Sequence, residues 1–171
     1  MSTYGYLSLT LGLLLMLPGP PLAAWEVVSQ ADSSSNIQTR IAHAENNEGY
    51  TLDIYRDSVG AIRARFSLNR PLDKLPARHC PTFQVDDRIL DNRSVNDAPC
   101  INDADWSEFV LGYVNVKEVI SPKLYALVNG ETLTYRFMLD HGGYDETSFS
   151  LNGSKRATLT VLGGNVSIIP R

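Results

Sequence analysis

Residues 50–68 read YTLDIYRDSVGAIRARFSL, two segments of alternating residues joined by a short turn. In the second segment, Ile62 and Phe66 share one face, and Arg63 and Arg65 share the other. A period of two is typical of a strand with one buried face. The stretch therefore predicts a β-hairpin with an apolar and a polar side.

The turn of this hairpin predicts its register. Gly60 suits the left-handed position of a three-residue loop, since glycine adopts positive φ without a steric clash. The expected opposite pairs are Asp57 with Ala61, Tyr55 with Arg63, Ile54 with Ala64, Asp53 with Arg65 and Leu52 with Phe66. Apolar residues then meet apolar residues and polar residues meet polar ones, as a half-buried hairpin requires. This register gives Arg65 a carboxylate and Arg63 an aromatic face.

Short strands separated by turns continue along the chain. We expect them at residues 26–30, 37–44, 82–85, 109–116, 132–139, 144–151 and 166–169. A short helix is expected between Ser121, a capping residue followed by proline, and Gly130, and a second at residues 154–162. The predicted fold class is all-β with one or two short helices, as an antiparallel sandwich or a partly open barrel.

Length and charge limit the classes of function. The chain has 171 residues, a net charge of −4 and 43% hydrophobic residues. That composition predicts a globular chain, and we expect one β-sandwich domain over residues 25–171. A general nucleic-acid binder needs a basic surface to neutralise phosphates, so we expect no nucleic-acid partner.

The first 24 residues are typical of a signal peptide. Residues 7–17 form a short apolar run, followed by prolines and by Leu22-Ala23-Ala24. Eleven residues in a helix reach about 16 Å, about half the thickness of the hydrocarbon core. We therefore expect export, cleavage after Ala24 or Ala23, and no transmembrane segment in the mature protein.

Export decides how the two cysteines, Cys80 and Cys100, are interpreted. An isolated pair in an oxidising compartment forms a disulfide in most proteins. The polar residues between them bury little apolar area, so a cross-link is useful there. We predict a disulfide rather than a thiol nucleophile.

The polar side of the hairpin is the candidate binding site. Arg63 and Arg65 form either a patch for an anionic ligand or an ordinary solvated sheet face. The sequence leaves both alternatives open.

Catalytic, cofactor and metal sites are not predicted. The three histidines His43, His79 and His141 lack the spacing of a zinc site. Nucleophile-elbow, P-loop and dinucleotide motifs do not occur in the sequence.

Four segments carry a resemblance to a known family: Trp25; residues 71–76 leading to 83–87; residues 100–102; and residues 127–137 before 149–153. Their order resembles the invasion-associated locus B family of bacterial exported proteins. The resemblance implies a β-rich periplasmic or cell-surface protein, associated with host-cell invasion or stress, without established catalytic residues.

The expected function is that of an exported, non-enzymatic binding protein of the periplasm or cell surface, with an unknown protein or envelope component as partner. One alternative is an envelope hydrolase whose acids come from loops: Asp86, Asp87, Asp140, Asp145 and Glu146. The other is a small-molecule carrier with an apolar barrel interior.

Overall fold

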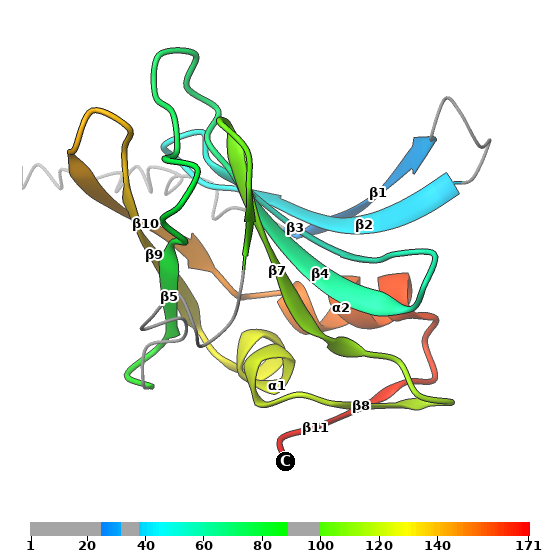
Figure 1. Cartoon of the computed structure of the whole chain (residues 1–171). Coiled ribbons are helices and arrows are strands. Elements are labelled where there is room, and N and C mark those ends of the chain that lie inside the picture. The colour runs from blue at the N-terminus through cyan, green and yellow to red at the C-terminus, as the bar shows by residue number, and fades with distance from the viewer. Residues whose placement is uncertain (1–24, 32–37, 89–99) are drawn as a thin grey trace, which may run out of the picture.

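The fold is a β-sandwich with two short helices (Figure 1), seen in a computed structural model that describes residues 25–31, 38–88 and 100–171. The larger sheet is antiparallel, with the strand order β1-β2-β3-β4-β7-β6. Its strands are β1 (Glu26–Ala31), β2 (Gln38–Glu45), β3 (Thr51–Arg56), β4 (Ala61–Ser67), β6 (Ile101–Asn102) and β7 (Trp106–Tyr113).

The second sheet has the antiparallel order β10-β9-β5. It consists of β5 (Thr82–Val85), β9 (Thr132–Met138) and β10 (Tyr144–Ser150). A third, parallel pair joins β8 (Glu118–Ile120) to β11 (Ser167–Ile169). Helices α1 (Pro122–Asn129) and α2 (Ser154–Leu162) lie below the six-stranded sheet in the view of Figure 1. The sheets do not close into a barrel, so the sandwich is the correct alternative.

Aromatic rings fill the space between the two large sheets. Phe66 on β4 stacks on Tyr135 of β9, with ring centroids 4.7 Å apart. It also contacts Phe137 at 5.1 Å and Phe149 of β10 at 6.3 Å. Each of these rings is at most 2% exposed. The face of the six-stranded sheet that carries Phe66 is therefore the inner one, and the arginine-bearing face is the outer one.

The predicted hairpin register is confirmed. Strand β3 pairs with β4 so that Leu52 lies opposite Phe66, and Asp53 lies opposite Arg65. Gly60 has φ +87°, in the left-handed region that the loop requires. The side chain of Asp57 stabilises the loop, since it accepts hydrogen bonds from the backbone amides of Val59 and Ala61.

Both predicted helices are confirmed. The Ser121 hydroxyl accepts a hydrogen bond from the Leu124 amide at 3.0 Å, as an N-cap does. It also donates to the carbonyl of Leu111 on β7, which ties α1 to the sheet. Helix α2 starts after Gly153 and packs on β2 and β3.

Three details of the strand prediction are wrong. Strand β7 covers Trp106–Tyr113 rather than residues 109–116, because the chain leaves the sheet in a turn where Val116 has φ +55°. Strands β6 and β8 were not predicted, because they have too few residues to show an alternating pattern. Strand β11 pairs in parallel with β8, which a local pattern does not reveal.

The predicted disulfide joins Cys80 to Cys100, with their Cα atoms 5.8 Å apart. The structure thus agrees with an oxidising compartment. The predicted signal peptide lies outside the described residues. Across the described ranges, the helices are too short and too polar to cross a membrane.

Candidate functional site

A buried carboxylate organises the outer face of the six-stranded sheet. Glu108 on β7 is only 5% exposed, although it lies on the solvent side of the sheet. Its register partner on β4 is Arg65. Oε2 of Glu108 accepts hydrogen bonds from Nη2 of Arg65 at 2.8 Å and from Nε at 3.0 Å. Oε1 accepts a bond from Nη1 of Arg63 at 2.9 Å. Two guanidinium groups therefore cover one carboxylate.

The phenol of Tyr55 completes this cluster. Its hydroxyl donates to Oε2 of Glu108 and accepts from Nη2 of Arg65 at 3.0 Å. Burial raises the pKa of Tyr55 to about 12, and the hydrogen bond to Glu108 and the nearby negative charge add to the shift. The phenol is therefore neutral at physiological pH and acts as a fixed donor. We call Tyr55, Asp57, Arg63, Arg65 and Glu108 the outer-face cluster.

Asp57 gives the cluster a second carboxylate. Its Oδ2 accepts a bond from Nε of Arg63 at 2.7 Å. Burial raises the pKa of Asp57, but hydrogen bonds from Arg63 and from the Ala61 amide outweigh this and lower it below its usual value. The same bond is the first cause of a raised pKa for Arg63. Two arginines and two acids make the cluster electrically neutral.

Two aromatic rings contact the guanidinium of Arg65. Its Cζ lies 4.5 Å from the ring centroid of Trp106 and 5.6 Å from that of Tyr55. Its side chain keeps 36% of its surface exposed. Because the group is fixed by rings and by Glu108, it is presented to solvent in one orientation.

The structure changes the expected partners of the two predicted arginines. Both lie on the outer face, as predicted, but Arg65 does not pair with its neighbour Asp53. Asp53 binds His43 on β2, with 2.7 Å between Oδ1 and Nδ1. The ring of Tyr55 contacts Arg65 rather than Arg63. Glu108 was not predicted as part of the site, and its local signal is only a charged residue just before the apolar run 109–111.

A pocket of about 330 Å³ opens beside this cluster. It is lined by Gln30, Ala31, Thr39, Ile41, Asp53, Tyr55 and Arg65. Ile41 is 8% exposed and contributes apolar surface to the pocket. We call this cavity the β2–β4 pocket.

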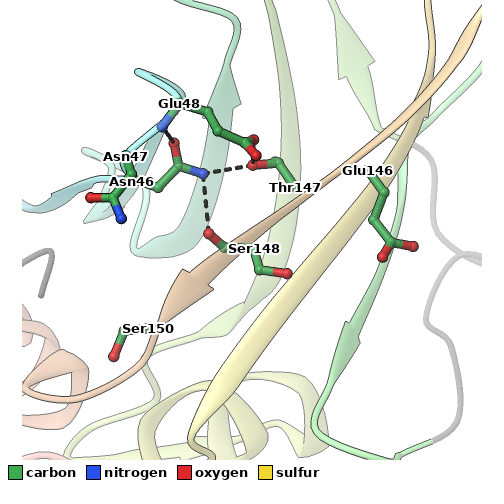
Figure 2. Close-up of a pocket in the computed structure, with 7 residues that line it drawn as sticks. All are labelled: Asn46, Asn47, Glu48, Glu146, Thr147, Ser148 and Ser150. Carbon is green, nitrogen blue, oxygen red and sulfur yellow. Dashed lines mark hydrogen bonds between the residues drawn. The ribbon is translucent and has the colours of Figure 1, made fainter. Parts of the chain in front are cut away.

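A second pocket, of about 280 Å³, lies between the β2–β3 turn and strand β10 (Figure 2). Nδ2 of Asn46 donates to the Thr147 hydroxyl at 2.6 Å and to the Ser148 carbonyl at 3.1 Å. Oε2 of Glu48 accepts a bond from the same hydroxyl at 2.5 Å. Glu146 points away from Glu48 (Figure 2) and pairs with Arg136 at 2.5 Å. The polar groups of this pocket thus bond largely to one another.

Three of the five carboxylates of the hydrolase alternative, Asp86, Asp145 and Glu146, have structural partners. Oδ1 of Asp86 accepts from the backbone amides of Glu131 and Thr132 at 3.0 and 2.9 Å. Oδ2 of Asp145 accepts from the Tyr50 hydroxyl at 3.1 Å. Burial and that bond raise the pKa of Tyr50 to about 12. Within residues 25–31, 38–88 and 100–171, no group of three or more His, Cys, Asp or Glu could hold a metal ion.

Comparisons of the chain with family models, curated proteins and solved structures found no match. The resemblance to the invasion-associated locus B family therefore stays a prediction.

Proposed function

We propose that the chain is an exported, non-enzymatic binding protein of the periplasm or cell surface, and that it binds its partner on the outer face of the six-stranded sheet. The partner is a protein or another envelope component. This is the role that the resemblance to the invasion-associated locus B family implies.

The outer-face cluster carries the proposal. Arg65 contacts Tyr55 and Trp106 there, and these three residue types are enriched at the centres of protein interfaces. A surface that is already ordered loses little entropy when it binds. Exposed apolar side chains continue the same face: Val110 is 36% exposed, and Ile101, the register partner of Glu108, is 54% exposed.

The charge balance favours such a partner over a polyanion. Asp57 and Glu108 neutralise Arg63 and Arg65 in direct contacts of 2.7 to 2.9 Å. The two arginines therefore supply orientation and planar hydrogen-bonding geometry rather than a net positive field.

Envelope extract from cells that express the protein provides the test. Immobilised wild-type protein should retain a partner, and Ile101→Glu should reduce its retention at least tenfold. The matched control is Ile120→Glu on β8, because Ile120 has a similar exposure of 58% but lies on another element. Equal retention by both variants, or no retained partner, would contradict the proposal.

Mass spectrometry of the exported protein should find Trp25 as its first residue.

A further inference from the structure

The β2–β4 pocket holds two opposite charges that do not neutralise each other. Asp53 and Arg65 lie directly opposite in the register of β3 and β4, and both line this pocket. Opposite charges that face each other across two strands attract and can form an ion pair. In the described structure, Asp53 and Arg65 are not bonded to each other, because His43 binds Asp53 and Glu108 binds Arg65.

Each charge keeps hydrogen-bonding capacity. His43 uses Oδ1 of Asp53, while Glu108 and Tyr55 use Nε and Nη2 of Arg65. Within the described parts of the chain, Oδ2 of Asp53 and Nη1 of Arg65 have no hydrogen-bond partner. Both side chains are nevertheless held in place by their other bonds, so a ligand would not have to order them.

We propose that the β2–β4 pocket binds a small zwitterion of the α-amino-acid type. The ligand carboxylate accepts hydrogen bonds from Arg65, and its ammonium group donates to Asp53. One carboxylate and one guanidinium in the lining match a ligand that carries one charge of each sign. A ligand with only one of these groups would use only one of the two hydrogen-bonding sites that remain, Nη1 of Arg65 and Oδ2 of Asp53.

The remaining lining sets the size and polarity of the ligand. A cavity of about 330 Å³ is at the small end of ligand pockets. Ile41 and Tyr55 give it apolar surface, and Thr39 and Gln30 add neutral polar groups. This combination suits an amino acid with a short aliphatic side chain. The pocket shares Tyr55 and Arg65 with the outer-face cluster, but Ile101 is not among its lining residues, so binding of the zwitterion can be measured without the envelope partner.

Titration calorimetry with L-leucine tests the pairing of charges. Two analogues remove one charge each: 4-methylpentanoate lacks the ammonium group, and leucinamide lacks the carboxylate. We expect L-leucine to bind at least tenfold more tightly than either analogue, because charged hydrogen bonds contribute most of the recognition. Equal affinities for all three, binding of a neutral monosaccharide such as glucose instead, or no binding of L-leucine would overturn the proposal.

Variants locate the site. Asp53→Asn should weaken L-leucine at least tenfold and should not weaken 4-methylpentanoate, since the ammonium contact is lost and the contact with Arg65 remains. Glu146→Gln, a carboxylate change on β10, should alter neither affinity, and circular dichroism should show that both variants are folded. An unchanged L-leucine affinity in Asp53→Asn would overturn the assignment. Retention of an envelope partner is measured separately, so failure of the zwitterion site and failure of the proposed function are distinguishable.

Discussion

Arg65 lies opposite Asp53 on one side and opposite Glu108 on the other, and its ion pair is with the glutamate. Arg63 and Tyr55 bind the same carboxylate, so the charge of the buried Glu108 is compensated. Asp53 binds His43 instead. As a result, the opposite charges of Asp53 and Arg65 lie on neighbouring strands without an ion pair between them.

Replacing the central carboxylate should lower stability. Glu108→Gln is expected to lower the free energy of unfolding by about 3 kcal/mol, because two guanidinium groups lose a buried counter-charge. Urea denaturation at pH 7 measures it. Glu146→Gln breaks a pair with side chains 40% and 55% exposed, and should cost about 1 kcal/mol or less. Equal losses in the two variants would contradict the central role of Glu108.

Alkaline pH should destabilise the fold between about pH 10 and pH 12. The pKa values of Tyr50 and Tyr55 are raised to about 12, above the value of about 10 in an unfolded chain. Their contribution is therefore full below pH 10 and is lost as the pH rises through 12. Urea midpoints measured from pH 8 to pH 11.5 should fall, and Tyr55→Phe should flatten part of the fall. A parallel curve for the variant would exclude Tyr55 as a cause.

The disulfide should contribute about 3 kcal/mol to stability, the value that the chain-entropy model gives for a loop of this length. The double variant Cys80→Ser/Cys100→Ser should lose that amount in urea denaturation. Reduction of the wild-type protein with dithiothreitol should cause the same loss. Two free thiols in the protein purified without reductant would contradict the bond.

Gly130 should be the least tolerant glycine at the end of a helix. A Cβ atom at this position would lie 2.3 Å from Cγ1 of Val85 and 3.0 Å from the Ala126 carbonyl oxygen. Gly130→Ala should therefore cost about 2 kcal/mol through overpacking.

Gly143→Ala is the matched control for that experiment. Its new Cβ would meet the imidazole of the exposed His141 at 2.8 Å, and this side chain can turn into solvent. The thermal midpoint should change little for Gly143→Ala and fall clearly for Gly130→Ala. The reverse order would show that β5 shifts easily.

Much of the fold could be predicted from local sequence patterns. The hairpin register followed from one turn and one alternating pattern, because strands joined by a short loop can pair in few ways. The outer-face cluster could not be predicted in full. Glu108 is 43 residues from Arg65, and no local signal states which strand lies beside β4. Sequence placed Arg63 and Arg65 on the correct face but gave them the wrong partners.

Trp25 covers the last carbonyl of β10, which is an edge strand of the three-stranded sheet. Its Nε1 donates to the Ser150 carbonyl on β10 at 2.8 Å, and the residue is only 6% exposed. An open strand edge invites pairing with other chains. Trp25 is thus the natural limit for trimming the amino-terminal side: a version that begins at Glu26 would leave that carbonyl uncovered and would tend to self-associate.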